Sequence, residues 1–183
     1  MCPNFTGMKS RKKIIGLVVL VTAAIYIAYA AWPRPVPAEI LQEPNEILTS
    51  VSEEVTNFDE QTKQIAEELK IVIKKADFRG HIFGLGLAAP QLGYNQRIIA
   101  LKSSYGNYQI MVNPKIVEQK WQLPWTEKCL SLEGRHFLKR YFWLKVQYQD
   151  IEGNDFEETI IGPRAAVLQQ EIDHINGVLI SDY

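Results

Sequence analysis

The residues best suited to chemistry are Gln170, Glu171 and His174, which follow one another within a single predicted helix. Residues four apart on a helix lie one above the other, so Gln170 and His174 share a face and Glu171 lies beside them. A histidine at position 170 would make this stretch a two-histidine metal site with an adjacent carboxylate for proton transfer. Glutamine stands there instead, and the stretch therefore indicates a metal site with an altered set of ligands.

Cys129 is a second candidate for chemistry because its thiol can bind a metal. The sequence has one other cysteine, Cys2, which is far away and in unlike surroundings. A disulfide scaffold is therefore not expected, and we interpret Cys129 as a free thiol.

Two helices and several hairpin strands must position these residues. Asp59 is predicted to cap a helix over about residues 60–76, where apolar residues recur at helical spacing. A second helix opens at Gly162-Pro163, runs to about residue 175 and carries the Gln170–His174 stretch. Strands are predicted over residues 97–101, 108–112, 115–118, 141–149 and 156–161, with a Gly- and Ala-rich turn over 82–91 and a break at Asn113-Pro114. The pattern predicts an α+β fold, with antiparallel sheets and hairpins packed around the C-terminal, motif-bearing helix.

Three segments, in order, resemble the motifs of the peptide deformylases. Residues 84–91 read GLGLAAPQ, residues 127–131 read EKCLS, and residues 170–174 read QEIDH. The family motifs are GxGLAAPQ, EGCLS and HExDH, so the only departures are Lys128 and Gln170. The resemblance covers about residues 46–183 and implies the fold of that family.

The resemblance also implies an activity, which is the metal-assisted hydrolysis of the formyl group from the N-terminal formyl-methionine of peptides. The family metal is one divalent ion, Fe²⁺ or Zn²⁺, held by one cysteine and two histidines. Carried over, Cys129 and His174 would be metal ligands, and Gln170 stands in the place of the third. Glu171 would be the general base that takes a proton from metal-bound water and passes it to the leaving amine.

The same resemblance assigns roles to three residues that would not touch the metal. The side-chain amide of Gln91 and the backbone N–H of Leu130 would stabilise the oxyanion that develops on the formyl oxygen. Gly86 would let the substrate chain approach the protein backbone closely. Asp173, by contrast, is interpreted as structural, paired with an arginine such as Arg140.

Gln170 leaves two functional interpretations open. Its neutral amide oxygen is a weak donor to Fe²⁺ or Zn²⁺ beside a thiolate and an imidazole. The first interpretation is a metal-dependent deformylase with an altered ligand set. The alternative is a catalytically inactive module, anchored to a membrane, that binds formylated or other N-terminal peptides without hydrolysing them.

Charge is distributed unevenly along the 183 residues. Residues 1–38 hold five basic residues and no acidic ones, whereas the rest of the chain holds 15 basic residues and all 21 acidic ones. A mildly acidic domain gives no electrostatic support for nucleic-acid binding. The resemblance to the deformylases implies formylated N-terminal peptides as the partners.

The N-terminal region predicts a membrane segment. A basic tail over residues 1–13 precedes an uncharged run over 14–32, which as a helix would reach about 28 Å and so match a bilayer core. A Pro-rich linker over 33–45 separates it from the domain over 46–183. The basic tail predicts a cytoplasmic N-terminus and a single-pass protein with its domain across the membrane. The alternative is a signal peptide, cleaved near Ala28-Tyr29-Ala30, and a secreted domain.

Overall fold

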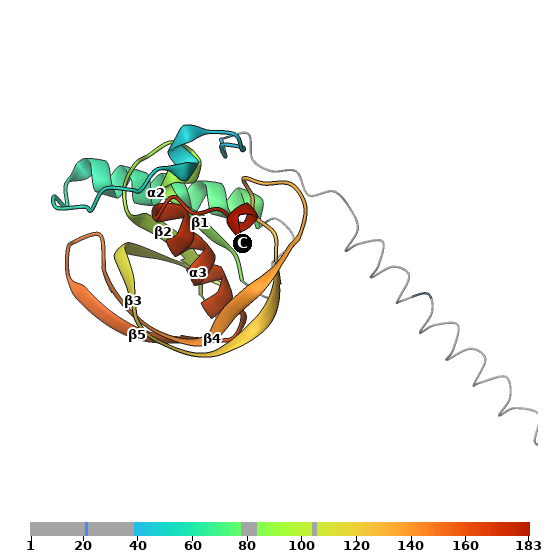
Figure 1. Ribbon diagram of the computed structural model, residues 1–183. Coiled ribbons are helices and arrows are strands. Elements are labelled where there is room, and N and C mark those ends of the chain that lie inside the picture. The colour runs from blue at the N-terminus through green and yellow to red at the C-terminus, as the bar shows by residue number, and fades with distance from the viewer. Residues whose placement is uncertain (1–20, 22–38, 78–83, 104–105) are drawn as a thin grey trace, which may run out of the picture. The chain divides into compact units, whose positions relative to one another are not determined.

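The computed structural model describes residue 21 and residues 39–77, 84–103 and 106–183 (Figure 1). The chain divides into two compact units, Met1–Pro35 and Val36–Tyr183. The predicted basic tail and almost all of the predicted membrane segment lie outside the described residues. Within the described ranges, no helix is long and apolar enough to cross a membrane.

One antiparallel sheet forms the framework of the second unit. Its five strands pair in sequence order, so that each strand is bonded to the next one along the chain. The strands are β1 (Gly86–Ala88), β2 (Ile98–Lys102), β3 (Tyr108–Glu127), β4 (His136–Gln149) and β5 (Asp155–Ile161). The helices are α2 (Glu60–Ala76), α3 (Pro163–Ile175) and the short 3-10 turns η1 (Glu46–Thr49), η2 (Ala89–Leu92) and η3 (Ile180–Asp182).

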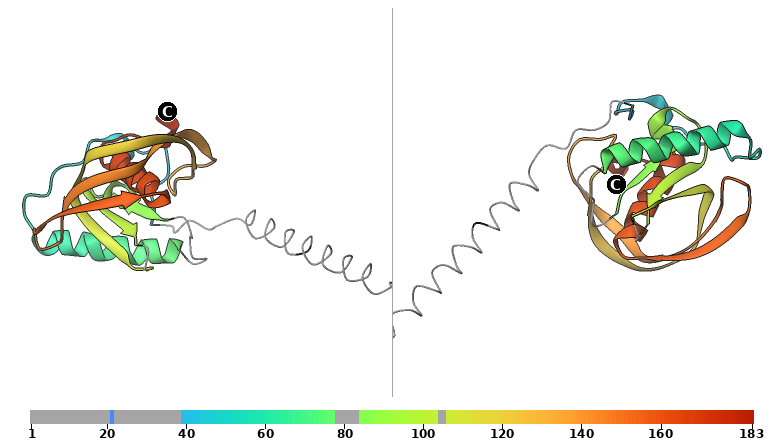
Figure 2. Two further views of the ribbon diagram at one scale, coloured as in Figure 1. Left: turned by 90° about the horizontal axis from the view of Figure 1, so that it is seen from below. Right: turned by 180° about the vertical axis from the view of Figure 1, so that it is seen from behind.

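The two long helices pack on opposite faces of β2. Ile98 and Ala100 belong to the core beneath α2, whereas Ile99 and Leu101 belong to the core around α3. Successive strand residues point to opposite faces, so a strand covered on both sides has an unbroken apolar sequence. Figure 2 shows α2 and α3 on either side of β1 and β2, and Figure 1 shows the long strands curving around α3. The predicted α+β fold is confirmed, with one curved sheet in place of several.

Both predicted helices are confirmed, and α2 begins at the residue that the sequence predicted. Asp59 caps it, because its carboxylate accepts hydrogen bonds from the N–H groups of Gln61 and Thr62 at 3.0 and 3.2 Å. The second helix begins at Pro163. Proline lacks a backbone N–H, but an N–H in the first turn of a helix has no helical partner, so no hydrogen bond is lost. Local signals therefore fixed both helices.

The predicted break in the third strand is wrong. Strand β3 runs through Asn113-Pro114 as a single element of 20 residues. Register shifts on either side of Ile116 absorb the disturbance, and Asn113 adopts a φ of 51°. The side-chain amide of Asn113 accepts from the Val55 N–H at 2.9 Å and donates to the Val55 C=O at 2.8 Å, which attaches β3 to residue 55 at this point. The predicted turn over 82–91 also differs, since it contains β1 and η2.

The folded unit begins before the predicted boundary at residue 46. Ile40, placed by the sequence in the linker, is 3 % exposed and belongs to the core beneath α2. The three residues after it bond η2 and the loop between β3 and β4. The Leu41 N–H donates to the backbone carbonyl of Gln91, Gln42 Nε2 donates to the Leu130 carbonyl, and the Glu43 N–H donates to the Ser131 carbonyl. We call residues 40–43 the strap.

Candidate active site

The three motif segments meet inside the second unit. Cys129 lies in the loop between β3 and β4, and His174 lies in the last turn of α3. Their Sγ and Nε2 atoms are 3.1 Å apart although 45 residues separate them in sequence. The side-chain amide nitrogen of Gln91, from η2, is 3.8 Å from the same sulfur. The structure therefore gathers a thiol, an imidazole and an amide around one point.

Glu171 is the buried acid of this cluster. It is 2 % exposed, and its Oε2 atom has no hydrogen-bond partner among the described residues. Burial raises the pKa of this carboxyl well above its usual range, and the nearby charges of Glu127 and Asp173 raise it further. An unpaired buried carboxyl destabilises the fold, which makes a chemical role the better explanation of its presence.

Gly86 creates the space that Glu171 occupies. A Cβ atom at position 86 would lie 2.5 Å from Cγ and 2.6 Å from Cδ of Glu171, closer than real contacts allow. The side chain of Glu171 is therefore one reason why position 86 requires glycine. The role assigned from the resemblance, close approach of substrate, stays a prediction.

Gly86→Ala is expected to destabilise the protein by about 1–3 kcal/mol, because the new methyl group displaces the Glu171 side chain. The same change in a Glu171→Ala background is expected to have a much smaller effect, since the clashing atoms are gone. Urea unfolding of the four proteins measures both values. Equal effects in the two backgrounds would contradict the steric explanation.

Gln170 lies beside this cluster but bonds elsewhere. It is 7 % exposed, and its Nε2 atom donates to the Lys128 carbonyl at 3.4 Å. In the described part of the chain, no three His, Cys, Asp or Glu side chains lie together as a metal-binding group. Cys129 and His174 are thus the two strong donors, and an amide is the third side chain of the motif.

The two strong donors suit a divalent metal by their chemistry. Thiolate and imidazole are ligands that Zn²⁺ and Fe²⁺ bind well. In a tetrahedral zinc site these two ligand atoms stand roughly 3.5 Å apart, and the observed 3.1 Å requires only a small adjustment. Among the described residues, neither Nδ1 of His174 nor Oε2 of Glu171 has a hydrogen-bond partner, which is a further sign of a site built for a bound group rather than for packing. The donor set therefore fits one metal ion with two strong protein ligands.

Burial keeps the Cys129–His174 pair neutral in the metal-free protein. It raises the pKa of the Cys129 thiol to about 12 and lowers the pKa of the His174 imidazole to about 4. At pH 7, Cys129 is therefore a thiol and His174 a neutral imidazole. A divalent cation would lower the pKa of the Cys129 thiol again, since its charge favours the thiolate.

The lowered pKa of His174 predicts a loss of stability in acid. An unfolded histidine takes up a proton near pH 6.5, whereas the folded one resists protonation down to about pH 4. The stabilising contribution is therefore complete above pH 6.5 and is lost as the pH falls. Between pH 7 and pH 4.5 the free energy of unfolding should drop by about 2 kcal/mol on this account. Urea unfolding of chelator-treated protein checks this, and His174→Leu should lack that part of the drop.

Arg140 holds the surrounding acids in place. Its guanidinium bonds both carboxylate oxygens of Glu127 at 2.8 Å and reaches Asp173 at 2.6 Å. The pairing of Asp173 with Arg140 was predicted, and it is confirmed. Tyr183 was not predicted, and its hydroxyl donates to Asp173 at 3.0 Å. This network fixes the end of α3, and with it the position of His174.

Ser131, the last residue of the EKCLS segment, connects the Gln91 and Cys129 segments, a role that the sequence analysis did not assign to it. Its N–H donates to Cys129 Sγ at 3.3 Å, and its hydroxyl accepts from Gln91 Nε2 at 2.9 Å. The side-chain oxygen Oε1 of Gln91 in turn accepts from the Ala88 N–H at 2.9 Å, so the whole side-chain amide is oriented. Leu130 lies half-buried between Cys129 and Ser131. The predicted oxyanion groups thus lie beside the thiol.

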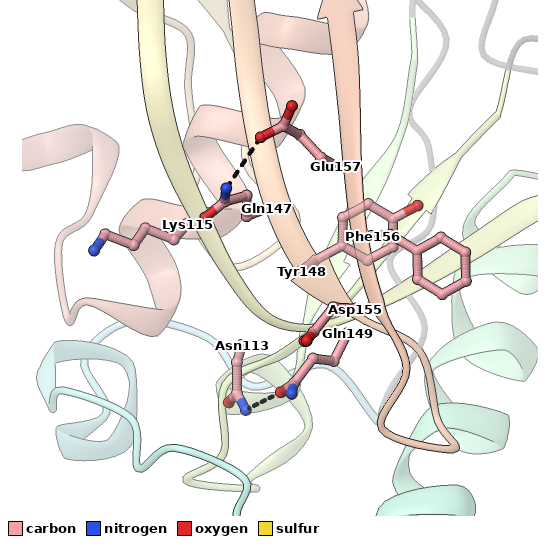
Figure 3. Close-up of a pocket in the computed structure, with 8 residues that line it drawn as sticks. All are labelled: Asn113, Lys115, Gln147, Tyr148, Gln149, Asp155, Phe156 and Glu157. Carbon is pink, nitrogen blue, oxygen red and sulfur yellow. Dashed lines mark hydrogen bonds between the residues drawn. The ribbon is translucent and has the colours of Figure 1, made fainter.

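A surface groove of about 490 Å³ lies apart from these residues, on β3, β4 and β5 (Figure 3). None of the predicted site residues lines it. Gln147, within it, points to Glu157 and bonds its carboxylate at 3.0 Å (Figure 3).

The α+β framework brings a buried thiol, an imidazole and a carboxylate together, an arrangement of groups that metal-dependent hydrolases use. The chain belongs to the polypeptide deformylase family, whose model matches residues 37–183. The resemblance drawn from the three motifs is thereby confirmed.

Individual relatives agree with the family match. A peptide deformylase of Desulfotalea psychrophila is 42 % identical over 106 residues, which are 55 % of this chain and 63 % of that protein. The match thus spans less than two thirds of that relative. The structure of the Thermotoga maritima peptide deformylase is 34 % identical, with a TM-score of 0.71 over 78 % of this chain and 94 % of that one. A Plasmodium falciparum peptide deformylase in complex with an inhibitor is 34 % identical, with a TM-score of 0.69 over 78 % and 86 %.

Proposed function

We propose that the folded unit hydrolyses the formyl group from the N-terminal formyl-methionine of peptides, using one Fe²⁺ or Zn²⁺ ion held by Cys129 and His174. The observation that carries the proposal is the buried, unpaired carboxyl of Glu171 beside the Cys129–His174 pair. The family match and the complete GLGLAAPQ segment support it.

A comparison within the site separates structural acids from the reactive one. Glu127 and Asp173 both bind Arg140, which compensates their burial. The negative charges of both acids raise the pKa of Glu171, yet its Oε2 has no hydrogen-bond partner among the described residues. An acid held in this state is available for proton transfer, and its raised pKa brings it toward the range in which a general base works best.

The reaction breaks the bond between the formyl carbon and the amine nitrogen. Water adds to the formyl carbon, Glu171 accepts its proton and delivers it to the nitrogen, and formate and a free N-terminus result. A metal ion held by Cys129 and His174 would supply Lewis-acid chemistry at this site. Gln91 faces the same site and donates to the charge that develops on the formyl oxygen.

The test uses the full-length protein, purified without oxygen and loaded with Fe²⁺ or Zn²⁺. We expect formate release from a formyl-methionyl tripeptide, with loss of release after chelation. Glu157→Gln, which changes an exposed acid on β5, serves as the matched control for acid substitutions and should keep full turnover. Protein that retains no metal and releases no formate would contradict the proposal.

A second function is favoured by one observation, the amide of Gln170 in the place of a metal ligand and bonded to the Lys128 carbonyl. On this alternative the domain binds formylated N-terminal peptides without hydrolysis. It predicts affinity for formyl peptides that chelators leave unchanged, measured by calorimetry. Affinity that disappears with the metal would exclude it.

We also propose that residues 14–32 anchor the protein in a membrane, with the N-terminus in the cytoplasm and the domain on the far side. The uncharged run and the preceding basic cluster support this. Alkaline extraction of membranes should leave the full-length chain in the pellet, whereas a cleaved, secreted domain would appear in the medium. A reporter fused at the C-terminus and active only in the cytoplasm would contradict the orientation.

A further inference from the structure

We propose that Gln42, in the strap, is a positioning residue for Cys129. Its side-chain amide fixes the peptide group between Leu130 and Ser131, and that peptide group supplies a hydrogen bond to the Cys129 sulfur. The bearing of this on catalysis rests on the function proposed above, but the structural role does not.

The geometry joins two hydrogen bonds through one rigid unit. Gln42 Nε2 donates to the Leu130 carbonyl oxygen at 3.0 Å, and the Ser131 N–H donates to Cys129 Sγ at 3.3 Å. This carbonyl and this N–H belong to the same peptide group, which is planar and has them on opposite edges. Rotation of the peptide plane therefore breaks both hydrogen bonds together. The bond from Gln42 to the Leu130 carbonyl in this way also orients the Ser131 N–H toward the Cys129 sulfur.

The strap is itself held firmly enough to act as a support. Ile40 is buried in the core, and Leu41 N–H donates to the Gln91 carbonyl at 2.8 Å. Gln42 Nε2 also donates to the Ile40 carbonyl at 3.1 Å, which orients the amide before it reaches the loop. Glu43 N–H donates to the Ser131 carbonyl at 3.0 Å, so the strap bonds two successive carbonyls of the loop.

Two effects make the Gln42 bond matter for the thiol. Sulfur is a weak acceptor, so the bond from Ser131 depends on good alignment. A hydrogen bond to a peptide carbonyl also polarises the group and strengthens its N–H as a donor, by roughly 10–30 %. Gln42 is exposed, and its substitution leaves the core untouched.

The experiment compares amide hydrogen exchange at Ser131 in full-length variants. Gln42→Met keeps the length of the side chain and removes the donor, so exchange at Ser131 should accelerate by up to about tenfold. Gln42→Glu should accelerate it further, because a carboxylate repels the carbonyl. Gln42→Lys restores a donor of similar reach and should return exchange to the wild-type rate. Gln147→Met removes an exposed amide bond on β4, away from the site, and serves as the matched control.

Wild-type exchange at Ser131 in Gln42→Met, or equal acceleration in Gln147→Met, would overturn the proposal. Turnover is measured on the same proteins, and we expect kcat to fall in Gln42→Met with KM unchanged. An unchanged kcat in Gln42→Met, whether or not KM changes, would overturn the catalytic part. Failure of the proposed function is distinguishable, because it shows as absent turnover in the wild type and leaves the exchange comparison intact.

Discussion

Replacing Gln170 with histidine is expected to raise the affinity of the full-length protein for Fe²⁺ or Zn²⁺ by at least about 100-fold. The change supplies a third strong donor to the Cys129–His174 pair, on the same face of α3 as His174. The substitution is local, since the one hydrogen bond that the Gln170 side chain makes within the described residues is a long one, to the Lys128 carbonyl. Turnover of formyl peptides should rise with metal occupancy.

Metal content after dialysis against graded chelator concentrations measures this effect. Gln170→Leu is the matched control, because it keeps a side chain of similar volume and removes the amide. If the natural amide binds the metal, Gln170→Leu should hold less metal than the wild type. Equal metal content in the histidine variant and the wild type would show that two strong protein ligands suffice.

Replacing Glu171 has the second large effect, and it acts on turnover and stability in opposite directions. Glu171→Gln should lower kcat by about 100- to 10,000-fold, because the proton acceptor is lost while the shape of the site is kept. Glu171→Leu should also stabilise the metal-free protein at pH 8, because it removes a buried carboxyl with a raised pKa.

The pH dependence of this stabilisation has a defined sign. Above about pH 4.5 the unfolded carboxyl loses its proton, whereas the folded one retains it up to its raised pKa. The folded protein therefore binds more protons, and Glu171 reduces stability progressively as the pH rises from 4.5. The advantage of Glu171→Leu should be largest at pH 8 and should vanish near pH 4.5 in urea unfolding. A constant advantage would point to packing rather than ionisation.

Local patterns were enough to predict the helices and most of the strands, and the three motifs named residues that the structure brings together. Asp59 caps α2 through neighbouring N–H groups, and the apolar run of β2 reports burial on both faces. Both signals lie within a few residues of the feature they predict. Cys129, Glu171 and His174 were identified because whole motifs surround them, which a single residue could not have done.

The contacts that complete the site could not be predicted, because they join residues distant in sequence. Gln42 bonds Leu130 across 88 residues, and nothing around Gln42 distinguishes it from a surface glutamine. The spatial clash that requires glycine at position 86 appears only when α3 is placed against β1. The bonds from Asn113, next to Pro114 in β3, to Val55 likewise span 58 residues of sequence.

The sequential order of the strands has a consequence for how the site forms. Each strand pairs with its neighbour in the chain, so the sheet closes only short loops and can assemble at small entropic cost. The strap and α3, by contrast, attach through contacts across much longer stretches of chain. We therefore expect the sheet to fold first and the reactive groups to come together last. On partial unfolding we expect the reverse order, in which the site residues separate while the sheet is still folded.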